Sequence, residues 1–266
     1  MKDSLLRIEK QVVICTRCAR LVEYRRRVAQ EKRKAYRDWK YWGKPIPGFG
    51  DPQARLLILG LAPAAHGGNR TGRVFTGDRS GDFLFGALYR TGFANQPTSV
   101  RRDDGLQLHD AYVTAAVRCV PPGNKPSPEE FRNCREYLER ELALLGKIKV
   151  VVALGKLAFD SYLSILRDRG WIRSRSGFRF SHGALYVFTP PEKSKQLGNL
   201  RTSLRLLPQN LPTLIASYHP SQQNTQTGKL SAEMLEAVFR KARDILHGSC
   251  AVSENPLGTS DPYRGS

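Results

Sequence analysis

The sequence predicts a single α/β domain in which helices flank a central parallel β-sheet, and three observations lead to this prediction. Short apolar runs with strand character alternate with longer segments of helical periodicity, an order typical of βαβ units. The runs are apolar at successive positions, as expected of strands buried on both faces. The length of 266 residues suits one domain better than two small ones.

The expected strands are short, and the chain before them is of a different kind. Residues 20–40 are dense in charge and are expected to form a helix or an extended surface segment. A Gly/Pro-rich stretch at 45–52 then predicts a loop. The strands follow at 54–59, 111–117, 149–154, 185–189 and 213–218.

Helical patterns lie between these strands, at 80–89, 127–145, 156–166 and 229–246. The start of the second is well marked, because Ser127 can cap it, Pro128 takes its first position and Glu130 completes a capping box. The last helix has one apolar face, which we assign to the core. The domain is therefore expected to span 1–248, and the Gly/Ser/Pro-rich residues 249–266 to form a disordered tail.

The charge balance points to a polyanionic partner. Lys and Arg number 43 against 24 Asp and Glu, a formal net charge of +19. Neutralising phosphates releases condensed counterions, so a chain this basic gains affinity for nucleic acid. We favour nucleic acid over an anionic membrane or a generally solvated basic surface.

No stretch of the sequence is long and apolar enough to span a bilayer. The N-terminus lacks the apolar centre and the cleavage site of a secretory signal. We therefore expect no membrane association and a cytoplasmic location, where thiols stay reduced.

Four of the five cysteines form a candidate metal site. Cys15 and Cys18 make a C-x-x-C pair, Cys119 follows an expected strand and Cys134 lies in the next expected helix. In a reducing compartment this pattern favours metal ligation over disulfides or buried free thiols. Four thiolates suit zinc as well as an iron–sulfur cluster, and the spacing leaves both open. Cys250 receives no role.

Ligands bind at the C-terminal ends of parallel strands, so the loops after 59, 117 and 218 are the candidate site. In the first loop, Gly60 and its small neighbours let backbone approach a ligand, and their N–H groups can hold an anion or a carbonyl oxygen. Phe75 either joins the core or stacks on a planar base. Asp78 either caps the helix at 80–89 or acts on a substrate.

Five motifs occur in an order that strongly resembles the uracil-DNA glycosylase superfamily, and most of all its family 5, or type B, branch of bacteria and archaea. The resemblance spans residues 6–246. The motifs are GLAPAAHG at 60–67, TGR at 71–73, FTGD at 75–78, RCVPPGNKP at 118–126 and HPSQQN at 219–224.

This resemblance implies a fold, a cofactor and a reaction. The sheet would have four parallel strands between helices. The four cysteines would hold a structural 4Fe–4S cluster that ties the N-terminal segment to the core. The enzyme would hydrolyse the N-glycosidic bond of uracil, leaving an abasic site. Hypoxanthine and modified uracils are further candidate bases. The expected partner is double-stranded DNA with a deaminated base, bound by a monomer in a bacterial or archaeal cytoplasm.

We expect the target nucleotide to be flipped out of the duplex, with its base stacked on Phe75. His219 would donate to a carbonyl oxygen of the departing base, and Asp78 would orient the attacking water. The pocket would be lined by Gly60, Ala62, Ala64 and Asn124, and the catalytic residues would be Asp78, Asn124 and His219.

Five residues are expected at the DNA backbone: Arg70, Arg73, Lys125, Ser221 and Asn224. For the two arginines and the lysine, ordinary surface charge is an equal alternative. Gln223 stands where related branches insert a leucine, so the residue that fills the vacated stack is not identified.

One departure from the superfamily bears on the mechanism. Most branches place Asp, Asn or Glu in the first motif, whereas Ala62 and its neighbours offer no polar side chain. The family 4 branch, which would carry Glu there, is therefore disfavoured. The alternative from another class is a non-catalytic four-cysteine metal module that binds nucleic acid.

Overall fold

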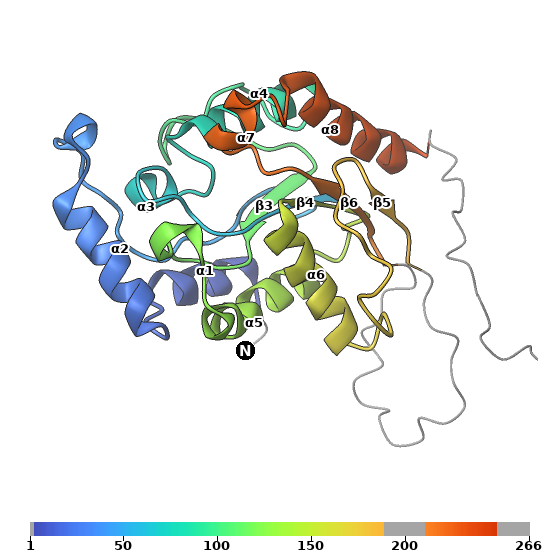
Figure 1. Cartoon of the computed structure of the whole chain (residues 1–266), viewed down its shortest axis with the longest axis horizontal. Coiled ribbons are helices and arrows are strands. Elements are labelled where there is room, and N and C mark those ends of the chain that lie inside the picture. Colours follow the sequence, from blue (N-terminus) through green and yellow to red (C-terminus); the bar gives the residue numbers. More distant parts are fainter. Residues whose placement is uncertain (1–2, 189–210, 249–266) are drawn as a thin grey trace, which may run out of the picture.

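The computed structural model describes residues 3–188 and 211–248, and its centre is a β-sheet (Figure 1). Four adjacent strands run parallel in the order β3 (Ala111–Ala115), β2 (Leu56–Gly60), β4 (Val150–Leu154) and β6 (Thr213–Ser217). Every residue in them is buried, which confirms the strands expected from continuous apolar runs. The strands begin nearly in register, so their C-terminal ends meet at one edge.

Two edge strands complete a six-stranded sheet, and both correct the sequence analysis. β1 (Phe49–Gly50) pairs antiparallel with β3, inside the segment predicted to be a loop. β5 (Leu185–Tyr186) pairs antiparallel with β6 and is shorter than the predicted 185–189; residue 189 lies outside the described residues. Strands of two residues carry too little periodicity to be read from sequence.

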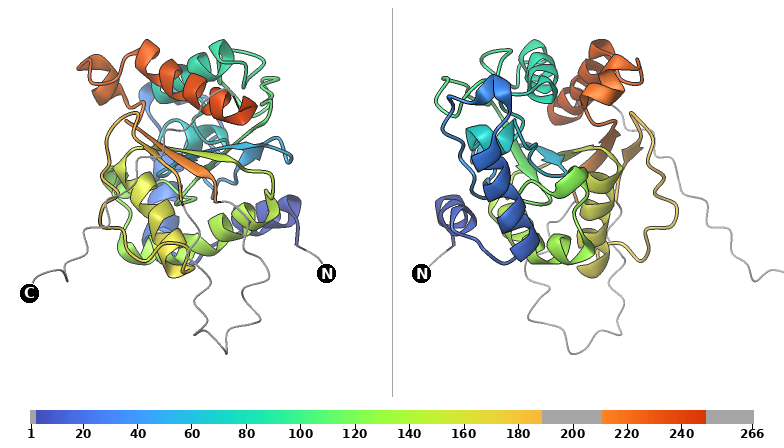
Figure 2. Two further views of the ribbon diagram at one scale, coloured as in Figure 1. Left: turned by 90° about the vertical axis from the view of Figure 1, so that its right-hand side faces the viewer. Right: turned by 60° about the vertical axis from the view of Figure 1, so that its left-hand side comes forward.

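Helices cover both faces of the sheet, as predicted. Figure 2 shows α4 (Arg79–Arg90) and α8 (Ala232–His247) on one face, and α5 (Pro128–Leu144) and α6 (Lys156–Asp168) on the other. α1 (Leu5–Val13) packs on the outer side of α5. The fold is thus a single α/β domain with a mostly parallel central sheet.

Each face of the sheet has its own core, because successive strand residues point to opposite sides. Leu56 and Ile58 of β2 pack into the core under α4 and α8. Leu57 and Leu59 pack into the core under α5 and α6. All four are fully buried, and each burial stabilises the fold by about 1.5–3 kcal/mol.

The helix starts follow their caps. In α5 the Ser127 Oγ accepts from the backbone N–H of Glu130, and the Glu130 carboxylate accepts from the N–H of Ser127, which confirms the capping box. α8 begins at Ala232 rather than at 229, because the side chain of Ser231 caps it by accepting from the N–H of Met234.

The charged N-terminal region is helical, one of the two expected states. α2 (Ala19–Glu31) leads into a short 3-10 helix, η1 (Lys34–Tyr36), and lies beside α3 (Gly68–Thr71) in Figure 1. The remaining short helices are η2 (Pro122–Asn124) and α7 (Gln222–Gln226). The predicted tail at 249–266 lies outside the described residues. Within 3–188 and 211–248, no helix has the length and apolarity needed to cross a membrane.

Candidate active site

Phe75 and His219 meet at the C-terminal edge of the parallel strands. Their ring centroids are 5.7 Å apart, with a 32° angle between the planes. Gly60 ends β2 under the Phe75 ring, where an added Cβ would lie 2.8 Å from a ring carbon. Gly155, directly after β4, lies under His219 in the same way, with 3.3 Å between an added Cβ and the His219 Cβ. The Phe75 ring therefore rests on the backbone of Gly60, and the Cβ of His219 lies close to Gly155. The predicted place of Gly60 in the base pocket stays a prediction.

His219 is uncharged at neutral pH. Burial lowers the pKa of its imidazole to about 4, because the charged form would lose its hydration. A neutral imidazole still carries one N–H donor. The loop around it is braced by Asn224, whose side-chain N–H donates to the carbonyl of His219 at 2.8 Å. His219 can therefore donate a hydrogen bond without carrying a charge.

Ser221 and Asn224 shape the His219 loop. The Ser221 Oγ accepts from the backbone N–H of Asn224 and caps α7. These contacts give both residues a local structural task. Their predicted role at DNA phosphates stays a prediction.

Asp78 has the capping role that was one of its two interpretations. Its Oδ1 accepts from the backbone N–H of Gly81 at 3.0 Å, at the start of α4. Its Oδ2 lies against Gly67, so closely that an added Cβ there would be 1.8 Å away. Burial raises the pKa of the carboxyl, while the N–H groups of Gly81 and Ser80 oppose that rise. The carboxylate that caps α4 therefore also contacts the loop after β2.

Arg70 is a buried scaffold residue, which corrects its expected place at a phosphate. Its side chain is 3% exposed and donates to the carbonyls of His66 (2.7 Å) and Gly77 (2.5 Å). The guanidinium lies between the rings of Tyr36 and Trp39, 3.9 and 4.1 Å from their centroids. Arg70 therefore joins the loop after β2 to the residue before Asp78.

Arg73 is also buried, and its expected phosphate contact is corrected as well. Its guanidinium forms an ion pair with Asp104 at 2.8 Å and donates to Ser99 and Thr76. Backbone N–H groups of the segment 100–106 hold the same carboxylate. In this structure the charge of Arg73 is satisfied within the protein.

The other predicted residues are near the site or on its rim. Ala62 and Ala64 are half-buried in the loop after β2, and Ala62 packs against the cysteine-containing cluster described below. Asn124, with φ of 57°, and Lys125 are exposed on the loop after β3. Among the described residues no hydrogen bond engages the Asn124 side chain. The roles of all four stay predictions.

His182, which sequence reasoning missed, positions the His219 loop. Its Nδ1 accepts from the backbone N–H of Tyr218 at 3.2 Å, and its ring stacks on Tyr218 with centroids 5.2 Å apart. Burial lowers the pKa of His182, which keeps Nδ1 available as an acceptor. No motif surrounds this histidine in the sequence, so only its contacts reveal it.

The four predicted ligand cysteines gather where α1, α2 and α5 meet. Cys119 and Cys134 are buried, Cys18 packs against their cluster with Leu21 and Val117, and all four thiols are free of disulfides. The pKa of Cys134 is raised to about 11, chiefly by burial and to a smaller extent by the nearby Cys18 and Cys15. The pairs that are distant in sequence therefore converge.

Hydrogen-bond donors surround these sulfur atoms. The backbone N–H of Arg118 points at the Cys134 Sγ (3.5 Å) and the side chain of Asn133 at the Cys18 Sγ (3.4 Å). Arg25 is 4% exposed, its charge opposes the raised pKa of Cys119, and its Nε has no partner. These donors and the buried cation oppose the rise that burial imposes on the pKa values of the thiols. Within the described part of the chain, no three Cys, His, Asp or Glu side chains are placed to share one ion.

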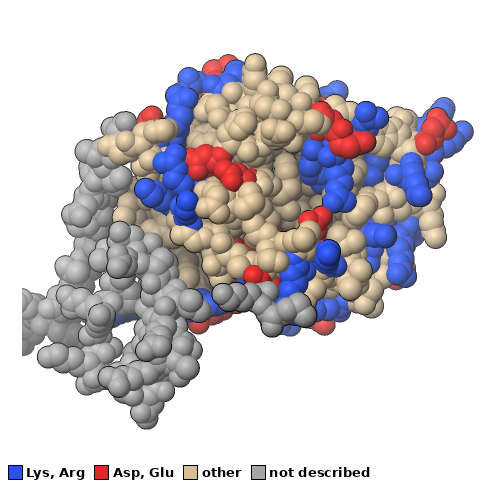
Figure 3. All heavy atoms as spheres, turned by 180° about the vertical axis from the view of Figure 1, so that it is seen from behind, with Lys and Arg blue, Asp and Glu red and all other residues tan. Residues whose placement is uncertain are grey.

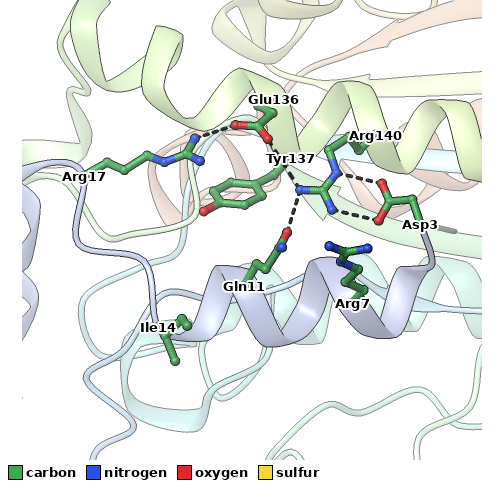
Figure 4. A pocket seen from close by; sticks show the side chains of 8 residues that line it. All are labelled: Asp3, Arg7, Gln11, Ile14, Arg17, Glu136, Tyr137 and Arg140. Atoms are coloured by element: carbon green, nitrogen blue, oxygen red, sulfur yellow. Dashed lines mark hydrogen bonds and ion pairs between the residues drawn. The ribbon is translucent and has the colours of Figure 1, made fainter. Parts of the chain in front are cut away.

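A cavity of about 530 Å³ lies away from this site, between α1 and α5 (Figure 4). Arg140 crosses it, donating to Asp3 (2.8 Å) and Gln11 (2.7 Å), and Arg17 pairs with Glu136 at 2.7 Å. These contacts join α1 to α5. None of the predicted site residues lines the cavity.

The fold and this sheet edge define an α/β domain that carries two paired aromatic rings and a buried carboxylate at the C-terminal ends of its parallel strands, the usual ligand position in such sheets. Comparison with known families is more specific. Residues 47–243 match the Uracil DNA glycosylase superfamily, and the chain belongs to that superfamily.

Relatives agree over nearly the whole chain. A type-5 uracil-DNA glycosylase of Thermus thermophilus is 46% identical over 87% of this chain and 93% of its own. Those of Mycobacterium leprae (44%, covering 91% of this chain and 96% of its own) and Pyrobaculum aerophilum (43%, 87% and 89%) are similar. Nothing in these comparisons supports a non-catalytic metal module.

Proposed function

We propose that this protein is a monofunctional DNA glycosylase that hydrolyses the bond between uracil and deoxyribose and leaves an abasic site. The observation that carries the proposal is the pairing of Phe75 with a neutral His219 over Gly60 and Gly155. Membership of the superfamily and the names of the type-5 relatives support it.

Base binding follows from the aromatic face of Phe75. An extruded uracil is planar, and stacking on an aromatic side chain contributes about 1–3 kcal/mol. The absence of a side chain at Gly60 lets the ring lie against β2, which sets its height above the sheet. We place backbone groups of Ala62 and Ala64 and the amide of Asn124 around the base.

Leaving-group stabilisation falls to His219. As the glycosidic bond breaks, negative charge develops on the base oxygens, and a preorganised donor there lowers the barrier by about 3–4 kcal/mol. A neutral imidazole suits this task because it donates a hydrogen bond to the oxygen and keeps its proton, whereas an imidazolium transfers a proton more readily. The bonds from Asn224 and to His182 hold the loop in place.

Water activation falls to Asp78. The departing base leaves positive character on the sugar, which a carboxylate stabilises while it accepts a hydrogen bond from the attacking water. Oδ1 is held by Gly81, so the carboxylate cannot rotate freely. Because position 62 is an alanine with no polar side chain, Asp78 is the nearest candidate acceptor along the chain.

The four cysteines would hold a 4Fe–4S cluster, whose role is to cross-link the N-terminal helices to the core. Thiolates of such a cluster bind different iron atoms, so they lie further apart than the ligands of a single ion. The donors from Arg118 and Asn133 and the charge of Arg25 suit sulfur atoms that carry negative charge.

The remaining assignments concern the partner. We place double-stranded DNA on the rim formed by Lys125, Ser221 and Asn224, bound by a monomer in the bacterial or archaeal cytoplasm. A pocket without a polar first-motif side chain would also admit hypoxanthine or modified uracils.

The test is excision from a duplex oligonucleotide with one uracil, followed by alkali cleavage and a denaturing gel. Cleavage at the uracil is expected, with none in a matched thymine duplex. A Phe75→Ala variant should bind and excise less well. Tight binding without any abasic product would refute the proposed activity.

A further inference from the structure

Residues 32–44, here called the basic aromatic segment, take no part in the proposed chemistry. Their sequence alternates cations with aromatic rings: six Lys or Arg stand against the single carboxylate of Asp38, among two tyrosines and two tryptophans. Interleaved basic and aromatic residues are typical of nucleic-acid-binding surfaces. In the structure, the aromatic residues and the cations of this segment point in different directions.

The aromatic residues face inward and hold the segment to the catalytic loops. The rings of Tyr36 and Trp39 make cation–π contacts with the guanidinium of Arg70, with their centroids 3.9 and 4.1 Å from it. Arg70 in turn donates to the carbonyls of His66 and Gly77, on either side of the loop that ends at Asp78. The segment is therefore joined to the site through one buried cation.

Further contacts fix its position. The Tyr41 hydroxyl and the His66 Nδ1 are 3.0 Å apart. The backbone N–H groups of Trp42 and Gly43 donate to the carbonyls of Arg70 and Asn69 in α3. The segment is thus attached along its length to the helix that follows the first site loop.

The cations face outward. Arg33, Lys34, Arg37 and Lys40 are exposed, and none forms an ion pair with another described residue. The backbone N–H of Arg33 donates to the Tyr41 hydroxyl at 3.5 Å, and that hydroxyl lies 3.0 Å from the His66 Nδ1, so Arg33 lies close to the site loop. In Figure 3, Lys and Arg side chains gather at the end of the molecule that carries α2 and η1.

We propose that the basic aromatic segment is a second DNA-binding surface, which contacts backbone phosphates of the duplex next to the extruded nucleotide. This inference rests on the proposed function, because the substrate must be DNA. Phosphate contacts do not distinguish one base from another. The four exposed cations of the segment therefore position the duplex, and the pocket selects the base. Their rigid attachment to Arg70 sets the distance between bound backbone and Asp78.

The experiment compares two fourfold variants of the full chain. One changes Arg33, Lys34, Arg37 and Lys40 to Gln. The control changes four exposed cations at the opposite edge of the sheet that likewise form no ion pair within residues 3–188 and 211–248: Lys147, Lys149, Arg173 and Arg175. Each lowers the formal net charge from +19 to +15, four fewer cations, so overall charge is matched.

Affinity for an undamaged duplex is measured between low and moderate salt, because each phosphate contact contributes about 0.9 to the slope of log K against log salt. The segment variant should lose about 3 in slope and bind at least about tenfold more weakly near physiological salt, while the control keeps its slope. With subsaturating enzyme on a uracil duplex, single-turnover excision should slow in the segment variant and stay unchanged in the control.

Equal slopes for the two variants, or a segment variant that loses only affinity for anionic vesicles, would overturn the proposal. Unchanged melting temperatures show that both variants fold. If the unmodified protein excises no uracil, the proposed function fails, and binding to the undamaged duplex still tests the surface separately.

Discussion

His219 is a histidine whose surroundings favour the uncharged imidazole. The folded state keeps its imidazole neutral, with a pKa of about 4 against an ordinary 6.5. Below pH 6.5 the unfolded chain therefore binds a proton that the folded chain refuses. The contribution of the His219 imidazole to the free energy of unfolding has its full value above pH 6.5 and is lost as the pH falls toward 4.

We expect the His219→Gln variant to lose less stability than the unmodified protein between pH 6.5 and 4. The difference in slope should approach about 1.4 kcal/mol per pH unit, the value for one proton. Urea unfolding at several pH values measures it, and the other histidines and carboxylates cancel in the comparison. At neutral pH the same variant should excise uracil about 10²–10³-fold more slowly. Parallel stability curves for the two proteins would contradict a buried neutral imidazole.

Asp78→Asn separates the two tasks of this residue. Asn caps helices about as well as Asp, so α4 should keep its stability. The amide cannot accept and orient water as a carboxylate does, so single-turnover excision should fall by at least about a hundredfold. Chemical denaturation and rapid-quench assays measure the two effects.

Asp82→Asn is the control, because Asp82 is an exposed carboxylate in the first turn of the same helix. It should keep the excision rate. An Asp78→Asn variant with full activity would remove Asp78 from the mechanism.

At the scale of elements, glycines decide how closely the loop after β2 approaches its neighbours. Gly67→Ala places a Cβ where the Asp78 Oδ2 now lies, so the carboxylate must move. Crowding of this kind costs about 1–3 kcal/mol. We expect a lower melting temperature and at least about tenfold slower excision, since small displacements of a catalytic group cost that much or more.

Gly146→Ala provides the comparison, because a Cβ there meets no atom within 4 Å and its φ is ordinary. That variant should be neutral or slightly more stable. If both variants behave alike, close packing of Gly67 on Asp78 is not functionally important.

The elements that could be predicted from the sequence are those whose signals lie within a short stretch of the chain. The capping box of α5 and the apolar runs of the four parallel strands lie within a few residues of one another in the chain. The buried states of Arg70 and Arg73 depend on Tyr36, Trp39 and Asp104, about thirty residues away, so their charge alone suggested a surface role. Sequence motifs likewise found Phe75, Asp78 and His219, whereas His182 acts only through the fold.

At the scale of the whole molecule, ion pairs join the N-terminal segments to α5. Arg20 of α2 pairs with Glu130 of α5 at 2.6 Å, and Arg140 of α5 binds Asp3. Between these contacts the four cysteines converge with Arg25. A cluster at this point would bind three separate parts of the chain, so its loss should loosen the N-terminal helices first.

We therefore expect the purified protein to contain iron and acid-labile sulfide in the ratio of a 4Fe–4S cluster, and Cys134→Ser to lose both. Since a thiolate ligand is then missing at the junction of α2 and α5, the variant should also melt at a lower temperature and be cleaved faster by protease within residues 3–31. Cys250→Ser, which changes the one cysteine outside the predicted set, should keep iron, sulfide and stability. If the unmodified protein contains zinc and no acid-labile sulfide, the cysteines bind a single zinc ion and the predicted cluster is wrong. Full iron content in Cys134→Ser would show that the ligands lie elsewhere.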